Sequence, residues 1–421
     1  MRRRSCDGQA AEIVVLCPHF EPDNAPTGTV MTRIVRELVG LGHCVHVVTA
    51  LPWYHEHRIE PSWEGKLVRR ELTPWGSITR VHPFPGDDKT DLARRAFGFV
   101  ASSTLMGLMG LRAGRGWFRR IDVVLAMSPP LTLGMTGWFV ARLRRARMVF
   151  NIQDVFPDAA IEIGAISNRY VIGIASWVER LSYRSADAVT VLSDDLADNV
   201  RGKLPVQFAD TVHVIPNFVD TEAIVPDNRL TALRAELGVG DEPVVLYAGN
   251  LGFSQSFGLL FHAARHRPDV TFLIVGAGAA RIDLDAQAAG LANVLVRDYV
   301  DVDRLPELLA TGDIHVVPLK KGLGRVSVPS KIYSIMAAGR PALAAIDSDT
   351  AVPAMLDASG GGIAVEPDNP EAFLNALNRL LALDDLGLTL GAGGRRWVVA
   401  HAAPRAVGAA YSDLLDSLAH R

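Results

Sequence analysis

A chain of 421 residues is long enough for two or three domains, each with its own hydrophobic core. Hydrophobic residues make up 49% and charged residues 21% of it, as in ordinary globular proteins, and a net charge of −3 gives no reason to expect a nucleic-acid partner. Residues 1–200 hold 24 Lys and Arg against 21 Asp and Glu, whereas residues 201–421 hold 19 against 25. The basic half could meet an anionic surface or substrate, or the difference could be chance variation between solvated surfaces.

The cysteines and the N-terminus bear on the compartment. Cys6, Cys17 and Cys44 are odd in number and lack metal-ligand spacing, so we expect no disulfide framework and no zinc site. Polar residues, and not an apolar stretch, follow Arg2–Arg4, so we expect no export signal. Together these features favour a cytoplasmic location.

Short β-branched runs alternate with longer helical patterns along the chain, which indicates parallel βα units. In the first half the expected strands are Glu12–Cys17, Cys44–Thr49, Leu67–Leu72, Ile78–His82, Asp122–Ala126, Met148–Ile152 and Ala188–Leu192, with helices near 28–41, 90–112, 131–146 and 169–185. In the second half the expected strands are Val244–Ala248, Val270–Val275, Val294–Val296, Ile314–Pro318 and Pro341–Ala345, with helices near 255–266, 281–290, 303–310, 331–338, 351–357 and 370–382. Each series opens with a strand and a glycine-bearing turn, so we expect an α/β protein with two Rossmann-like domains that face each other across a cleft.

The segment Val214–Asp220 contains a proline and turn formers, and we expect it to link the two domains. The predicted domains are therefore 1–213 and 214–403. Residues 404–421 include a short amphipathic helix, which we expect to pack back on the first domain.

The run Ala96–Leu111 is uncharged over 16 residues, which is shorter than the roughly 20 needed to span a bilayer. Arginines flank it on both sides: Arg94, Arg95, Arg112, Arg115, Arg119 and Arg120. A buried domain helix is the favoured interpretation, and a helix lying on a membrane surface is the alternative.

Glycines follow several of the predicted strands. Gly28 and Thr29 open the first helix, where free N–H groups could meet a phosphate, although a plain βα turn would look the same. Asn250, Gly276 and Gly278 lie after the first two strands of the second series, at strand ends where open α/β sheets bind ligands.

The stretch Lys320–Tyr333 combines glycines, cations and a helix start. Ser330 is a candidate N-cap, and the helix N–H groups, Lys331 and Arg325 would form an anion site suited to a diphosphate. A solvated basic loop is the alternative.

The run Val328–Pro341 resembles the donor-site helix of glycosyltransferase family 4, and the Tyr247–Gly252, Gly276–Gly278 and Val214–Asp220 segments match that family in the same order. Asn151–Asp158 is similar to a Gln-Asp-Leu-Trp-Pro-Asp string in a narrower branch that includes fucosamine transferases of O-antigen and capsule synthesis. The resemblance covers essentially the whole chain. It implies a GT-B fold and a retaining transferase, with a nucleotide-sugar donor, UDP-linked, mainly on the second domain and the acceptor mainly on the first.

The resemblance also assigns roles. Lys331 would stabilise the leaving diphosphate, and Gln153 and Asp154 would orient the sugar or the acceptor. Gln153 stands where many members have a histidine that meets a sugar 6-hydroxyl, which permits a 6-deoxy donor without requiring it. The expected donor sugar is an N-acetylated or 6-deoxy amino sugar.

The chain departs from the family at the donor site. The usual Glu-x7-Glu pair falls at Val326 and Ser334, and the usual Arg and Lys fall at Asn250 and Gln255. No Asp-x-Asp motif is present where a metal would bridge the diphosphate, so we expect no metal and no other cofactor.

The acceptor is less defined. Trp53 and Tyr54 follow the second strand, where they could stack on an acceptor or serve as hydrophobic anchors. We expect a lipid-linked saccharide at the cytoplasmic membrane face, with a soluble small molecule as the alternative. Two other functions stay open: a sugar-nucleotide 2-epimerase on the same fold, and a non-catalytic sugar-nucleotide-binding protein.

Overall fold

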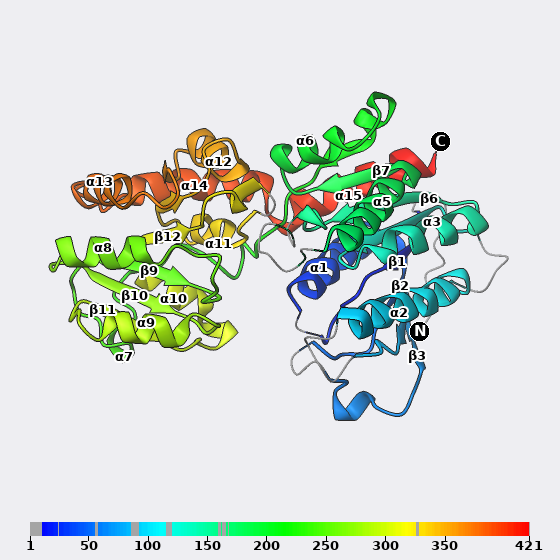
Figure 1. The fold of residues 1–421 in the computed structure, drawn as a ribbon, viewed down its shortest axis with the longest axis horizontal. Coiled ribbons are helices and arrows are strands. Elements are labelled where there is room, and N and C mark those ends of the chain that lie inside the picture. Colours follow the sequence, from blue (N-terminus) through cyan, green and yellow to red (C-terminus); the bar gives the residue numbers. More distant parts are fainter. Residues whose placement is uncertain are drawn as a thin grey trace. The chain divides into compact units, whose positions relative to one another are not determined.

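The computed structural model describes residues 11–23, 25–54, 58–85, 92–114, 120–158, 161, 166, 168–325 and 328–420, with the backbone alone for 92–96 and 325. It separates into two compact units, one made of Met1–Pro216 with Pro404–Arg421 and the other of Asn217–Ala403 (Figure 1). The segment expected as the linker begins earlier, at Val214, but Val214 ends a short strand of the first unit.

The first unit has an eight-stranded sheet in the described part of the chain, in the order β3-β4-β2-β1-β5-β6-β7-β8. Only β3 runs antiparallel to its neighbour. The strands are β1 (Glu12–Leu16), β2 (Cys44–Ala50), β3 (Val68–Thr73), β4 (Gly76–Val81), β5 (Val123–Ser128), β6 (Arg147–Ile152), β7 (Ala188–Val191) and β8 (Val212–Val214). Every residue of β2 and β5 is buried, because helices cover both faces of a parallel sheet.

The direction of each crossover decides which face its helix covers. The chain moves one way across the sheet from β1 to β2 and the opposite way through β4, β5, β6 and β7. Since such crossovers are right-handed, α2, α3 and α5 share one face and α1 lies on the other. Helix α15 packs on α1, as the sequence predicted for the C-terminal segment. The helices are α1 (Pro26–Gly40), α2 (Leu92–Leu111), α3 (Thr132–Arg144), α5 (Arg169–Ser185), α6 (Asp194–Gly202) and α15 (Pro404–Ala419), with short 3-10 turns at Pro61–Trp63 and Val206–Thr211.

Hydrogen bonds from buried side chains tie α15 to the sheet. Asn151 on β6 donates to the Tyr411 hydroxyl at 2.7 Å, and His43 lies 2.7 Å from the Ser412 hydroxyl. The first unit is therefore completed by the last residues of the chain.

The second unit has a six-stranded parallel sheet among the described residues, in the order β11-β10-β9-β12-β13-β14. The strands are β9 (Val244–Ala248), β10 (Thr271–Val275), β11 (Val294–Arg297), β12 (Ile314–Pro318), β13 (Ala342–Ala345) and β14 (Gly362–Val365). Alternate residues enter separate cores: Val245 and Tyr247 pack in one apolar cluster, and Val244 and Leu246 in another. The helices are α7 (Ala232–Glu236), α8 (Gly258–His266), α9 (Arg281–Ala288), α10 (Leu305–Thr311), α11 (Lys331–Ala337), α12 (Ala351–Ser359), α13 (Pro370–Leu381) and α14 (Leu388–His401), with short 3-10 turns at Val302–Arg304 and Leu323–Arg325.

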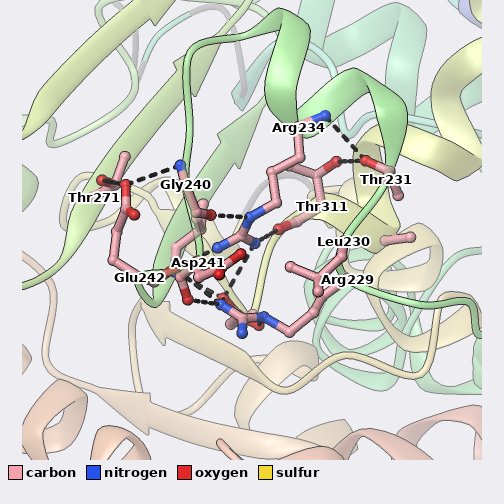
Figure 2. Close-up of polar contacts among 12 residues, drawn as sticks. Arg229, Leu230, Thr231, Arg234, Gly240, Asp241, Glu242, Thr271 and Thr311 are labelled. Carbon is pink, nitrogen blue, oxygen red and sulfur yellow. Dashed lines mark hydrogen bonds and ion pairs between the residues drawn. The ribbon is translucent and has the colours of Figure 1, made fainter.

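A buried arginine network fastens the start of the second unit to the amino ends of its strands (Figure 2). Arg234 is 2% exposed and donates to the carbonyl oxygens of Gly240 and Thr311 at 2.6 and 2.8 Å. The Asp313 carboxylate lies 2.6 Å from Arg229 and 3.5 Å from Arg234, and it also accepts the Val244 N–H. One carboxylate thus compensates two guanidinium groups at the edge opposite to the predicted ligand site.

Candidate functional site

The predicted donor site falls at the carboxyl edge of the second sheet, where the strand order reverses. Strand β9 pairs with β10 on one side and with β12 on the other, so the switch point lies between β9 and β12. Ligands of open parallel sheets bind at such a switch point. The described segments that meet there are Gly249–Gly252 after β9, Gly276–Gly278 after β10, and residues 319–325 and 328–330 after β12.

The two glycine turns pack against each other. Gly249 donates to the Val275 carbonyl and Leu251 to the Ala277 carbonyl, each at 2.9 Å. A Cβ atom at Gly276 would stand 1.9 Å from the Gly249 carbonyl oxygen, which no side chain can tolerate. Gly276 and Gly278 are therefore required by backbone packing, and they shape the site without offering it a side chain.

Asn250 is the exposed polar side chain on these turns. Its carboxamide oxygen lies 2.8 Å from the position that a Cβ atom of Gly278 would take, and its backbone carbonyl accepts the Tyr247 hydroxyl at 2.6 Å. The structure thus brings the predicted donor residues Asn250, Gly276 and Gly278 together.

Lys331, the first residue of α11, brings a cation to the same place. Its Nζ lies 3.6 Å from the centroid of the Tyr247 ring and 3.1 Å from where a Cβ of Gly249 would stand. No described residue accepts a hydrogen bond from this ammonium or forms an ion pair with it, and burial lowers its pKa to about 7. The side chain is thus held by an aromatic face, with its charge uncompensated.

The N-terminus of α11 differs from the prediction. The Ser330 hydroxyl makes no capping hydrogen bond, and the N–H groups of Ile332 and Tyr333 donate to the carbonyls of Pro329 and Ser330. The tight first turn satisfies these donors within the backbone, so they do not point freely at a ligand. Ser330 is exposed and Ser334, one turn later, is partly buried.

Two aspartates that the sequence reasoning missed hold the loop before α11. Asp347, just after β13, accepts the N–H groups of Gly322 and Gly324 at 2.8 and 3.3 Å. Asp368 accepts the Lys321 N–H at 3.1 Å. The sequence feature that could have pointed to Asp347 is its position just after a predicted strand. The Arg325 side chain, predicted to join this site, lies outside the described residues.

At the carboxyl edge of the first sheet, His19 and Asp23 organise the predicted acceptor residues. The His19 ring stacks on Trp53 with centroids 5.7 Å apart and meets Tyr54 edge-on at 5.4 Å. Asp23 lies 2.7 Å from His19 Nδ1 and accepts the Trp53 and Tyr54 N–H groups at 3.5 and 3.3 Å. The loops after β1 and β2 thus form one aromatic and acidic cluster.

Gly28 and Thr29 have structural roles at this edge. A Cβ atom on Gly28 would stand 2.9 Å from His19 Cβ and 3.0 Å from the Asp23 carbonyl oxygen, so glycine lets α1 approach the preceding loop. The Thr29 N–H is already bonded to the Ala25 carbonyl. The position of Gly28 fits the plain βα turn that was the alternative.

Gln153 and Asp154 follow β6 at the same edge. Gln153 is 6% exposed, and its amide donates to Asn151 at 2.9 Å, which continues the hydrogen-bonded chain to Tyr411. Gln153 is therefore held in one orientation, and Asp154 is the more accessible of the two.

A separate group of metal-binding residue types lies at the amino edge of the first sheet. Glu12, Cys44 and His46 offer ligand atoms within 4.8 Å of one another, in the only such group among the described residues. His46 is engaged with Glu12 at 3.1 Å and with Ser77 at 2.9 Å. These contacts explain the cluster as a buried hydrogen-bonded group without a metal. The cluster is also remote from the carboxyl ends of the strands, where the candidate site lies.

Comparison with known proteins assigns both units. Residues 27–217 match the family model of a glycosyl transferase 4-like domain, and residues 242–383 match that of glycosyl transferases group 1. Two Rossmann-like domains of these kinds define a glycosyltransferase of the GT-B type, so the chain is an enzyme of that class. The predicted resemblance to family 4 and the predicted α/β fold with two Rossmann-like domains are confirmed.

The chain is similar to WcaI of Escherichia coli (strain K12), a colanic acid biosynthesis glycosyl transferase by name, with 29% identity over 88% of this chain and 92% of that protein. Its fold is similar to that of sucrose-phosphate synthase from Thermosynechococcus elongatus, with a TM-score of 0.73, 19% identity and coverage of 97% and 99%. It is also similar to Anabaena HepE, solved in complex with UDP, with a TM-score of 0.68, 16% identity and coverage of 96% and 100%.

Proposed function

We propose that this glycosyltransferase moves a sugar from a UDP-sugar to a hydroxyl of a lipid-linked saccharide during polysaccharide synthesis, with retention of anomeric configuration. The Lys331 side chain beside the Gly249 turn carries the proposal, because its ammonium has no counter-charge among the described residues and can pair with a diphosphate at this place. Asn250 and Ser334 would bind the remainder of the donor.

In the proposed reaction the bond between the sugar C1 and the diphosphate oxygen breaks, and a bond between C1 and the acceptor oxygen forms on the same face. The acceptor proton passes to the departing diphosphate oxygen. Lys331 and Arg325 would stabilise the charge that develops on the diphosphate. Asp154 and the immobilised Gln153 would orient the sugar or the acceptor.

The nature of the substrates is supported by similarity. HepE was solved in complex with UDP, which supports a uridine nucleotide as part of the donor. WcaI is named for synthesis of a polysaccharide, colanic acid, which supports a saccharide acceptor. The proposed donor sugar is an N-acetylated or 6-deoxy amino sugar, and Gln153 in place of a histidine permits the 6-deoxy form. No metal or other cofactor takes part in the proposed reaction.

The aromatic cluster of His19, Trp53 and Tyr54 supports an acceptor on the first domain, because aromatic rings stack on sugar faces. A lipid-linked acceptor would place the enzyme at the cytoplasmic face of a membrane, as a peripheral protein. No helix in the described parts of the chain has the length and hydropathy to cross a bilayer.

Nucleotide release tests the proposal against its alternatives. Purified protein is incubated with UDP-, GDP- and dTDP-sugars, with and without a lipid-linked acceptor. We expect UDP release that depends on the acceptor, and an axial or equatorial product linkage that matches the donor. A new sugar nucleotide formed without acceptor would instead show an epimerase, and binding without turnover would show a non-catalytic protein.

A further inference from the structure

Helices α2, α3 and α5 lie side by side as one layer over the first sheet (Figure 1). Their outer side exposes an unusual number of large apolar side chains. On α5, Tyr170, Ile174 and Trp177 are 72%, 66% and 60% exposed and recur at helical spacing, so they form one stripe. Further exposed apolar residues continue this surface: Phe97, Val100 and Leu108 on α2, and Trp138, Phe139 and Leu143 on α3.

The charge of this layer has a single sign at its surface. The sequences of the three described helices contain one acidic residue, Glu179. Glu179 is 1% exposed and is bonded to Lys203 at 2.7 Å, so it contributes no negative charge outside. Arg142, Arg180 and Arg184 are exposed, and no described carboxylate forms an ion pair with them.

The basic residues at the rim of the first sheet behave differently. Arg120 pairs with Asp122 and Arg147 pairs with Asp187, each at 2.8 Å. The exposed arginines of α3 and α5 thus lie beside the apolar residues without a carboxylate partner. An apolar stripe bordered by cations, with no exposed carboxylate on the described parts of the three helices, is the composition of an interfacial membrane surface.

We propose that the layer α2–α3–α5 docks on an anionic lipid bilayer, with Tyr170, Ile174 and Trp177 of α5 inserted at the boundary of headgroups and acyl chains. Arg142, Arg180 and Arg184 then meet lipid phosphates. The charge pattern favours an anionic bilayer over a second copy of this chain, because an isologous contact would place like-charged arginines against one another. The inference rests on the proposed function in one respect only: a lipid-linked acceptor is the reason for the enzyme to be at a membrane.

Flotation of the full-length protein with vesicles tests the proposal. Vesicles of phosphatidylcholine with phosphatidylglycerol are compared with vesicles of phosphatidylcholine alone, at low and high salt. We expect binding to the anionic vesicles that weakens with salt but does not vanish. The variant Tyr170→Ser/Ile174→Ser/Trp177→Ser should lower the bound-to-free ratio by at least about tenfold, given the apolar area that it removes.

A matched variant controls for loss of surface hydrophobicity in general. Ile282 and Val302 of the second unit are 82% and 83% exposed, and Ile282→Ser/Val302→Ser should float like the unchanged protein. UDP binding, measured by thermal shift, should be the same in all three proteins because the α5 residues lie in another unit than the donor site. A circular dichroism spectrum and a thermal unfolding profile that match those of the unchanged protein show that the α5 variant is folded.

Two results would overturn the proposal. One is failure of the unchanged protein to float with anionic vesicles at low salt. The other is a self-associated protein that becomes monomeric in the α5 variant without any vesicle binding, which would make the layer a contact between copies. Absence of UDP binding in every variant, with flotation intact, would count against the proposed function and leave the membrane surface standing.

Discussion

Lys331 packs on the Tyr247 ring without an anionic partner among the described residues, so a ligand can use the whole of its charge. Replacing it by alanine should weaken UDP binding by about 1.5–3 kcal/mol, the range for a hydrogen bond to a charged group. Isothermal titration measures the change. Lys321→Ala, which removes an exposed lysine from the preceding loop, serves as the control and should leave the dissociation constant nearly unchanged. Equal affinities of Lys331→Ala and the unchanged protein would refute the role.

The titration of Lys331 should appear in the pH dependence of binding. Burial lowers its pKa from 10.5 to about 7, and a bound diphosphate favours the protonated ammonium. Above pH 7 the free side chain is increasingly neutral and must take up a proton to bind. The dissociation constant for UDP should therefore rise from pH 7 to pH 9, by at most about tenfold per pH unit.

Titrations of UDP in buffers of different ionisation enthalpy will detect this proton uptake directly. Lys331→Ala should show a flat profile over the same range. A steep profile that persists in the variant would assign the titration to another group.

The sequence predicted these side chains to different degrees. Asn250, Gly276, Gly278 and Lys331 could be placed together because each follows a strand of one parallel sheet, and strand ends meet at one edge. The contact of Lys331 with Tyr247 could not be predicted from the sequence, because the position of the Tyr247 ring depends on packing across strands. The pairing of Asp23 with Trp53 and Tyr54 joins loops that are distant in the sequence, and no local pattern reports it.

Helix α14 shows why one element escaped prediction. Gly391, Gly393 and Gly394 lower its helix propensity, so its sequence resembles a loop. In the structure, a Cβ atom at Gly391 would stand 2.1 Å from the Gly339 carbonyl oxygen, and one at Gly393 would stand 2.5 Å from the Ser359 carbonyl oxygen. The glycines thus permit close packing of α14 on its neighbours, and tertiary contact outweighs local propensity.

Short strands were also missed, and for a related reason. Strand β8 has three residues and β14 begins at the last of three consecutive glycines, so neither shows a β-branched run of its own. Both lie at a sheet edge and are held by a neighbouring strand. The longer inner strands were predicted because burial on both faces imposes continuous apolar runs.

The arginine network at the amino ends of β9 and β12 should dominate the stability of the second unit (Figure 2). In Asp313→Asn, Arg229 and Arg234 lose their shared counter-charge, and breaking a buried ion pair from one side costs about 3–5 kcal/mol. Chemical denaturation followed by circular dichroism measures the loss.

Asp285→Asn is the matched control for that substitution. Asp285 is half exposed and pairs with Arg281 on the surface of α9, so its removal should cost at most about 1 kcal/mol. A similar loss of unfolding free energy in the two variants would mean that burial does not make the Asp313 ion pairs more stabilising than a surface ion pair.

For the complete enzyme, we predict transfer without a divalent metal. Asp-x-Asp strings occur at 283–285, 301–303 and 347–349, but we expect none of them to bridge a metal and the diphosphate. Lys331 brings a cation to the proposed site, and the Asp347 carboxylate is engaged by backbone N–H groups. Activity should persist in excess EDTA at more than about half its initial rate, since the protein cations supply the stabilisation. Loss of activity in EDTA that Mg²⁺ or Mn²⁺ restores would show that the donor diphosphate needs a metal.

The return of α15 to the first unit has a consequence for synthesis of the protein on the ribosome. The first unit cannot complete its fold until residues 404–419 have left the ribosome, although most of its sequence is synthesised first. The whole second unit, Asn217–Ala403, is translated in between, which takes roughly 10–40 s at ordinary elongation rates. Throughout that interval, α1 lacks its packing contact with α15, and the Asn151 amide lacks its hydrogen bond to the Tyr411 hydroxyl. Nascent chains stalled before residue 404 should therefore present a folded second unit beside an incomplete first one, which is the species that chaperones would meet.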